Sequence, residues 1–286
     1  MSAKIVGWSD YLNLGHLPGQ TYDWHILAEG DSWFHFGFTP IIWKPRNLLD
    51  PLEFKKSTVI ANLALAGDTI QHISDPYSNP ILLEAVSYRK WHLILLSAGG
   101  NDLIDALNGD YQIGGEKIEI IKSGGSTSHF ISYIDSVALE ALLNHVEKYY
   151  IAVSELRNTL QNGITKDTKI VTHCYDYITP RNAPAKLAGK KFGPWAYKAL
   201  KQHAVPPGQW VYITDYLFER LADKLLQLPS KINNMHVINT LSTLHAAELD
   251  TTGDSNDWMN EIHPNPDGYK ILADKMVSPF IANILK

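Results

Sequence analysis

The chain has 286 residues, of which 45% are hydrophobic, enough to bury a sizeable core in one or two domains. Its formal net charge of −5 and the lack of a basic stripe argue against a nucleic-acid-binding protein. The single cysteine, Cys174, excludes an internal disulfide and a multi-cysteine zinc site. No apolar run approaches the roughly 20 residues of a membrane helix. Residues 1–20 lack the pattern of a signal peptide, so a cytoplasmic protein is expected.

Five short runs along the chain are continuously apolar instead of alternating with polar residues. They are residues 25–28, 58–63, 92–96, 169–174 and 236–239. This pattern is typical of strands that are covered on both faces of a parallel sheet. Amphipathic helical spacing lies between them, over residues 137–161, from an N-cap at Asp215, and from Pro266 to the C-terminus. The alternation predicts an open, doubly wound α/β fold.

The sequence shows no linker, low-complexity tract or internal repeat, so one domain over residues 1–286 is expected. Two stretches interrupt the alternation of strands and helices. Residues 103–135 contain two glycine pairs and predict an inserted hairpin. Residues 180–211 are rich in Pro, Gly, Lys and aromatic residues and predict a long surface excursion. Excursions of this length in compact domains are often functional.

Polar residues follow the first three predicted strands directly. They are Gly30-Asp31-Ser32, Gly67-Asp68 and Gly99-Gly100-Asn101-Asp102. Ligands of an open parallel sheet bind beyond the carboxyl ends of its strands, so these loops are expected to converge. Aromatic residues follow the serine, and they either pack in the core or line a pocket; they are Trp33, Phe34, Phe36, Phe38 and Trp43.

These residue types together provide the groups that acyl transfer needs. Ser32 at a strand-to-helix turn is a candidate nucleophile, provided that a base takes its proton. His263, near the C-terminus, is the candidate base because the pKa of imidazole lies near neutrality. The backbone N–H groups of Ser32 and Gly67 and the side-chain amide of Asn101 can stabilise the oxyanion that forms.

Four segments in order resemble the sequence blocks of the SGNH (GDSL-like) hydrolases. They are Gly30-Asp31-Ser32, Asn62 through Gly67, Gly99-x-Asn101-Asp102 and His263-Pro264. The resemblance spans nearly the whole chain. It implies a three-layer α/β/α, flavodoxin-like fold with an open parallel sheet of about five strands. It further implies serine-dependent hydrolysis of a carboxylic ester through an acyl-enzyme, without a cofactor or a metal.

The chain departs from the family pattern beside the histidine. The family has an acidic residue three positions before the histidine, and this chain has Asn260 there. An asparagine can accept a hydrogen bond from the imidazole N–H but offers no charge to the imidazolium. Asp257 approaching from the preceding turn, a backbone carbonyl, and a slow enzyme are three ways to account for the change.

Two rival functions remain open at this point. A degenerate SGNH domain could bind an ester or glycan with little turnover, and Asn260 favours this alternative. A flavodoxin-like nucleotide-binding protein is the other, although Asp31 would place a carboxylate where phosphate binds. The expected partner is a small-molecule ester, and the sequence predicts neither its acyl length, nor its alcohol, nor the oligomeric state.

Overall fold

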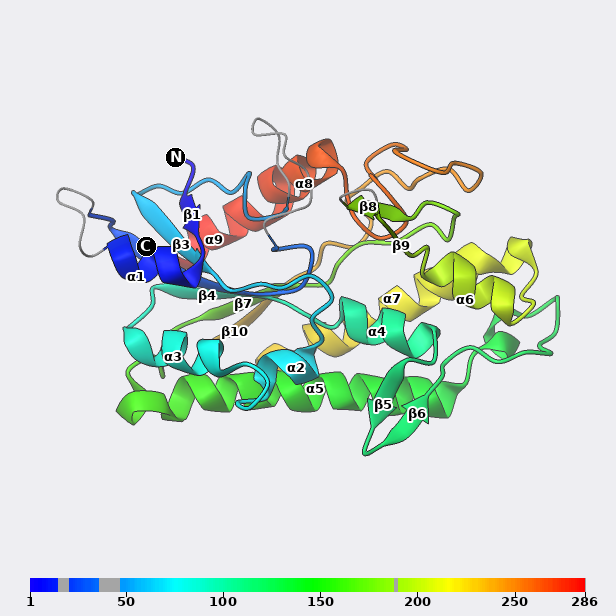
Figure 1. The fold of residues 1–286 in the computed structure, drawn as a ribbon, viewed down its shortest axis with the longest axis horizontal. Coiled ribbons are helices and arrows are strands. Elements are labelled where there is room, and N and C mark those ends of the chain that lie inside the picture. The colour runs from blue at the N-terminus through cyan, green and yellow to red at the C-terminus, as the bar shows by residue number, and fades with distance from the viewer. Residues whose placement is uncertain (15–20, 36–46, 188–189, 286) are drawn as a thin grey trace.

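The computed structural model describes residues 1–14, 21–35, 47–187 and 190–285. Its centre is a six-stranded, wholly parallel sheet in the order β1-β3-β2-β4-β7-β10 (Figure 1). The bounds of the strands are β1 Lys4–Val6, β2 Trp24–Gly30, β3 Thr58–Asn62, β4 Leu93–Ser97, β7 Ile170–His173 and β10 Met235–Ile238. The residues of β2, β3, β4 and β7 are nearly all buried, as their continuous apolar runs predict.

The five expected strands are all present, and they have the order 2-1-3-4-5 of a flavodoxin-like sheet. The additional strand, β1, pairs with the outer edge of β3. It was not predicted because it has only three residues, begins with an exposed lysine and carries no turn signal of its own. The strand order reverses between β2 and β4, which places the expected ligand crevice beyond the carboxyl ends of these two strands.

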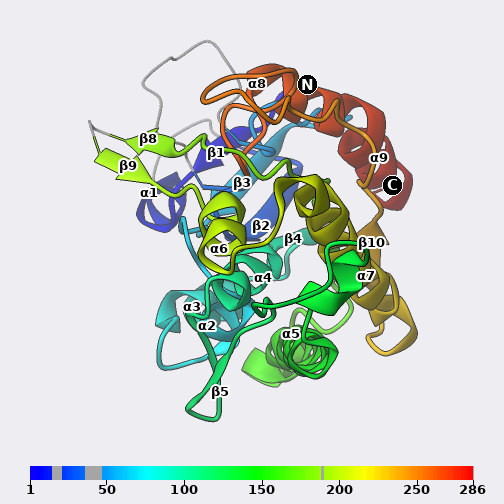
Figure 2. The same ribbon diagram turned by 90° about the vertical axis from the view of Figure 1, so that its right-hand side faces the viewer.

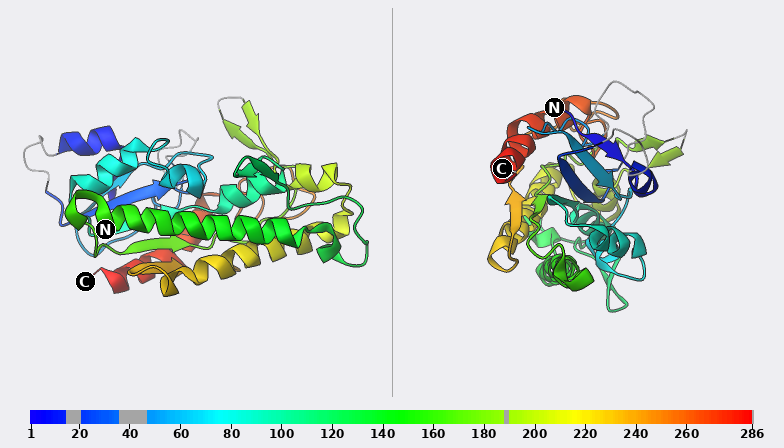
Figure 3. Two further views of the ribbon diagram at one scale, coloured as in Figure 1. Left: turned by 90° about the horizontal axis from the view of Figure 1, so that it is seen from below. Right: turned by 90° about the vertical axis from the view of Figure 1, so that its left-hand side faces the viewer.

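Helices cover both faces of the sheet and give three layers (Figure 2). One face carries α3 Pro80–Tyr88, α5 Ser136–Thr159 and α7 Trp210–Leu226, and the other carries α8 Pro266–Leu272 and α9 Ser278–Ile284. Viewed from below, α5 and α7 lie side by side along the molecule (Figure 3). The short helix α1 Trp8–Leu14 packs through Trp8 and Tyr11 on Tyr88 of α3.

The helix boundaries follow local capping for α5 and α8 but not for α7. The carboxylate of Asp135 caps α5, and the side chain of Asn265 caps α8 as expected. The expectation that Asp215 caps the next helix is wrong, because α7 begins at Trp210 and places Asp215 in its second turn. A short 3₁₀ turn at Pro207–Gln209 leads directly into α7, so the helix begins after this turn and not after Asp215.

Both interruptions of the alternation contain an antiparallel hairpin outside the main sheet. The first pairs β5 Tyr111–Ile113 with β6 Glu116–Ile118, and glycines 114 and 115 form its turn. The second pairs β8 Ala185–Leu187 with β9 Lys190–Phe192 and continues into α6 Ala196–Gln202. Residues 180–211 are therefore more regular than the expected excursion. Helices α2 Ile70–Ser74 and α4 Gly100–Leu107 follow β3 and β4.

Candidate active site

Ser32 lies two residues beyond the end of β2, at the switch point of the sheet. The turn depends on Gly30, because a Cβ there would lie 2.5 Å from the backbone oxygen of Ser97 on β4. The loop after β3 runs alongside, and its Leu65 N–H donates to the oxygen of Gly30 at 2.9 Å. Ser32 is half-buried and lines a cavity beyond the strand ends.

The structure brings Ser32 and His263 together although 231 residues separate them. The Oγ atom of Ser32 lies 2.7 Å from Nε2 of His263, a distance at which the hydroxyl donates to an unprotonated ring nitrogen. His263 is buried at the end of the loop that leads into α8, and Trp33 fixes this loop through a hydrogen bond from Nε1 to the Ile262 oxygen. A serine proton can therefore pass to His263 without movement of the backbone.

Asn260 orients the ring of His263. Its Oδ1 lies 3.0 Å from Nδ1 of His263 and accepts the backbone N–H groups of Ile262 and His263 at 3.1 and 3.0 Å. These two donors require an acceptor, so they fix the amide with its oxygen toward the ring. Nδ1 therefore carries the proton and Nε2 presents a lone pair to Ser32. Nδ2 of Asn260 is buried without a hydrogen-bond partner among the described residues.

Asp257, the other candidate for this role, contacts a different histidine. Its Oδ2 accepts the backbone N–H of His245 at 2.7 Å and lies 3.2 Å from Nδ1 of the same residue. The backbone oxygen of Asp257 accepts the N–H of Asn265, which is the residue before α8. Asp257 thus braces the loop, and of the two candidates it is Asn260 that contacts His263.

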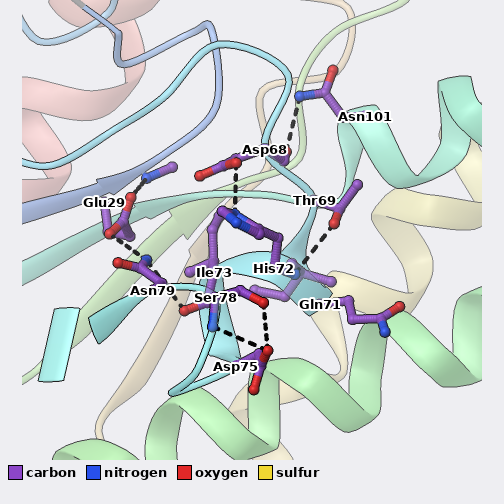
Figure 4. Close-up of polar contacts among 12 residues, drawn as sticks. Glu29, Asp68, Thr69, Gln71, His72, Ile73, Asp75, Ser78, Asn79 and Asn101 are labelled. Carbon is purple, nitrogen blue, oxygen red and sulfur yellow. Dashed lines mark hydrogen bonds and ion pairs between the residues drawn. The ribbon is translucent and has the colours of Figure 1, made fainter. Parts of the chain in front are cut away.

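The three candidate oxyanion donors lie on loops that contact one another. The side-chain nitrogen of Asn101 donates to the backbone oxygen of Asp68 at 2.9 Å (Figure 4). Asp68 follows Gly67, and its carboxylate pairs with Nδ1 of His72 at 2.8 Å. The N–H groups of Ser32 and Gly67 donate to none of the residues that the structure describes. Gly67 has φ of +90° and open space where a Cβ would point.

A buried hydrogen-bond network of Asp31, Ser97, His173 and Tyr175 underlies the serine loop, and Ser97 and His173 were not predicted as site residues. The carboxylate of Asp31 accepts from Ser97 Oγ at 2.8 Å and from the Tyr175 hydroxyl at 2.5 Å. Nε2 of His173 lies 3.0 Å from Ser97 Oγ. Burial raises the pKa of Asp31 to about 6, against the opposing effect of the hydrogen bond from Tyr175. The only sequence signal for these residues is their place at or just after the ends of β4 and β7.

The aromatic residues after the serine lie in the core where the structure describes them. Trp33 and Phe34 are both buried, and the ring of Trp33 stacks on that of His173 with 5.2 Å between centroids. Phe36, Phe38 and Trp43 lie outside the described residues.

The cavity beside Ser32 is small and largely apolar. Its volume is about 20 Å³. A single water requires about 10–15 Å³ by this measure. Besides residues of the serine loop and the start of α4, the cavity is lined by Ile104, Tyr175, Ile178, Phe218 and Ile262.

Burial lowers the pKa of His263 to about 4, so the imidazole is neutral at physiological pH and can act as a base. No cluster of three or more potential metal ligands occurs in the described part of the chain.

Comparison with known proteins gives the family of this chain. The model of the GDSL-like lipase/acylhydrolase family matches residues 26–276. Similar solved structures include a lipase from a goat rumen metagenome, with 15% identity over 88% of this chain and 95% of that chain and a TM-score of 0.49. An extracellular lipase from Streptomyces rimosus has 14% identity over 92% and 100%, with a TM-score of 0.44. Axe2, an acetylxylan esterase from Geobacillus stearothermophilus, has 12% identity over 92% and 94%, with a TM-score of 0.41.

No curated protein sequence matches the chain significantly. Across the residues that the structure describes, no helix has the length and apolar character to cross a membrane. The match to the family model covers most of the chain, including the β2 turn and the histidine loop. The chain therefore belongs to the GDSL-like lipase/acylhydrolase family and is a carboxylic ester hydrolase.

Proposed function

We propose that the protein hydrolyses short-chain carboxylic esters through an acyl-enzyme on Ser32. The observation that carries this proposal is the 2.7 Å contact between Ser32 Oγ and His263 Nε2. Nucleophile, base and orienting group form one chain of hydrogen bonds, because Asn260 accepts from Nδ1 of the same ring. This is the arrangement that activates a hydroxyl for attack on a carbonyl.

The reaction follows from these contacts. Nε2 of His263 takes the proton of Ser32 as Oγ attacks the carbonyl carbon of the ester. The N–H groups of Ser32 and Gly67 and the amide of Asn101 stabilise the negative oxygen. His263 then returns the proton to the leaving alcohol, and the acyl group stays on Ser32. A water molecule, deprotonated by His263, attacks this acyl group and releases the carboxylic acid and free Ser32.

The small cavity favours a short acyl group. By the measure in which one water needs about 10–15 Å³, the space of about 20 Å³ holds one group about the size of a methyl. The walls are buried and packed, and displacing them costs free energy. Acetate esters are therefore expected to be the preferred substrates.

A binding module with little turnover is the second candidate. Asn260 favours it, because a neutral partner does not stabilise the imidazolium that forms when His263 takes a proton. In that case the same crevice would hold an ester without rapid cleavage.

Hydrolysis of p-nitrophenyl esters from acetate to laurate by wild type and Ser32→Ala tests the proposal. We expect turnover to be highest for acetate, to fall with chain length, and to be lost in Ser32→Ala. Intact mass spectrometry after rapid acid quench is expected to show an acetyl adduct on wild type only. Equal hydrolysis by both proteins would contradict the proposal, and ester binding without turnover would favour the binding module.

A further inference from the structure

The hairpin β8–β9 is anchored to the loop that holds His263. The N–H of Glu261 donates to the oxygen of Ala183 at 3.0 Å, just before β8. After β9, the carboxylate of Glu261 accepts the backbone N–H groups of Trp195, Ala196 and Tyr197. Both ends of the hairpin are thus fixed to the residue next to Asn260. Figure 2 shows β8, β9 and α6 together at one end of the molecule.

An aromatic ring of this segment lies beside the general base. The indole of Trp195 is half-buried and meets the ring of His263 edge to face, with 5.8 Å between centroids. In the proposed reaction His263 gives its proton to the leaving alcohol. The alcohol part of the substrate therefore leaves past Trp195, where a half-exposed aromatic ring can contact a sugar ring.

The segment is strongly basic in an acidic protein. Residues 182–203 contain five lysines and no carboxylate, so they carry +5 against −10 for the rest of the chain. These lysines are all exposed; they are Lys186, Lys190, Lys191, Lys198 and Lys201. None of them forms an ion pair with a residue that the structure describes.

The register of the hairpin places two of these charges directly opposite each other. Lys186 is the pairing partner of Lys191 in the antiparallel ladder. Like charges at directly opposite positions destabilise a strand pair. A two-stranded hairpin is only marginally stable by itself, and this pair of charges does not add to its stability. An anion that lies across both lysines would relieve their repulsion.

We infer that the substrate is an ester of an anionic carbohydrate, which the lysines of the β8–β9 hairpin bind while its ester group enters the Ser32 site. The inference rests on the proposed function and adds the nature of the alcohol part. The small cavity beside Ser32 and the half-exposed Trp195 ring favour an acetylated sugar over a lipid. Basic residues beside an active site raise the association rate of an anionic substrate, and salt weakens this effect.

The test compares acetate release from O-acetylated polygalacturonate, which is anionic, and O-acetylated dextran, which is neutral. The variant Lys186→Gln/Lys190→Gln/Lys191→Gln removes the hairpin charges. A matched control, Lys55→Gln/Lys90→Gln/Lys166→Gln, removes three exposed lysines that lie just before β3, β4 and β7, at the opposite end of the sheet. Hydrolysis of p-nitrophenyl acetate reports the basal activity of each protein.

We expect the hairpin variant to lose about tenfold in kcat/KM on acetylated polygalacturonate at low salt. Its activity on acetylated dextran and p-nitrophenyl acetate should equal that of wild type. The control variant should match wild type on all three substrates. Raising the salt concentration to about 0.5 M should remove the preference of wild type for the anionic polymer.

Two outcomes would overturn the inference while leaving the proposed function intact. One is equal kcat/KM of wild type and hairpin variant on the anionic polymer, with Ser32-dependent cleavage of p-nitrophenyl acetate. The other is lysine-dependent sedimentation with phosphatidylglycerol vesicles without preference for the anionic polymer, which would assign the hairpin to membranes. Cleavage of p-nitrophenyl acetate that persists in Ser32→Ala would instead contradict the proposed function.

Discussion

The side-chain oxygen of Asn260 lies 3.0 Å from Nδ1 of His263 and holds the imidazole with Nε2 toward Ser32. Two backbone N–H groups fix this amide, so the asparagine gives the ring the orientation that an acid would give. What it does not provide is a negative charge. Orientation and charge can therefore be tested separately in this protein.

Replacing Asn260 by aspartate should raise the pKa of His263, because a carboxylate beside the ring stabilises the imidazolium. We expect the acidic limb of the kcat/KM profile to move up by at least about one pH unit. Asn260→Leu removes the acceptor for the ring and for two backbone N–H groups, and should lower kcat by about 10²–10³-fold. Rates on p-nitrophenyl acetate from about pH 3 to 9, over which the fold is checked by circular dichroism, measure both effects.

Asp257→Asn is the matched control for these variants. Asp257 contacts His245 and not His263, so its neutralisation should leave the acidic limb in place. If the acidic limb of the kcat/KM profile moved in Asp257→Asn and stayed in place in Asn260→Asp, then Asp257 and not Asn260 would be the partner of the His263 ring.

Activity of the wild-type protein should extend to low pH. Burial lowers the pKa of His263 to about 4, and the neutral form is the base. Above about pH 5 the ring is unprotonated and kcat/KM should be constant. Below pH 4 it should fall tenfold per pH unit as the ring gains a proton. Circular dichroism at each pH separates this effect from unfolding, and an acidic limb near pH 6.5 with intact structure would show that burial does not lower the pKa of His263.

The fold was predictable from sequence because its buried strands are continuous apolar runs. The five continuous apolar runs of the sequence correspond to strands β2, β3, β4, β7 and β10. Ser32, Gly67, Asn101 and His263 stood out because their residue types follow strands or resemble family blocks. That one domain spans residues 1–286 stays a prediction.

Contacts between distant, ordinary residues were not predictable. Tyr175 reaches Asp31 across 144 positions, and Glu261 binds the N–H groups of Trp195 through Tyr197. Neither contact has a local pattern, since each depends on how loops from different strands meet. The choice between Asn260 and Asp257 depended in the same way on the direction of two side chains in one loop.

Tyr175→Phe removes the hydroxyl that donates to Asp31 at 2.5 Å. The carboxylate is fully buried, so the loss should lower the free energy of unfolding by about 1–3 kcal/mol. We expect a smaller effect on kcat, because Ser32 and His263 keep their contact. Urea denaturation gives the stability. Thr240→Val, which removes a buried hydroxyl bonded to the Tyr175 backbone oxygen, serves as a comparison outside the Asp31 network.

Two glycines near the site should respond differently to alanine. In Gly30→Ala the new Cβ meets the Ser97 oxygen at 2.5 Å, so we expect a loss of about 2–4 kcal/mol in unfolding free energy. In Gly67→Ala the Cβ meets no atom within 4 Å, and only φ of +90° opposes it, at about 1–3 kcal/mol. Gly67→Ala should lose more activity than its stability explains, because the methyl group narrows the approach to the oxyanion donors. If Gly67→Ala and Gly30→Ala lost the same activity for each kcal/mol of unfolding free energy lost, the result would argue against that role for Gly67.

The most direct test of the central claim is labelling of Ser32 by a fluorophosphonate, which reacts only with an activated hydroxyl. Intact and peptide mass spectrometry would follow the reaction in wild type, Ser32→Ala, His263→Ala and Asp257→Asn. The account predicts stoichiometric labelling at Ser32 in wild type and Asp257→Asn, none in Ser32→Ala, and a labelling rate at least about 10³-fold lower in His263→Ala. Labelling at another residue, or an unchanged rate in His263→Ala, would contradict it.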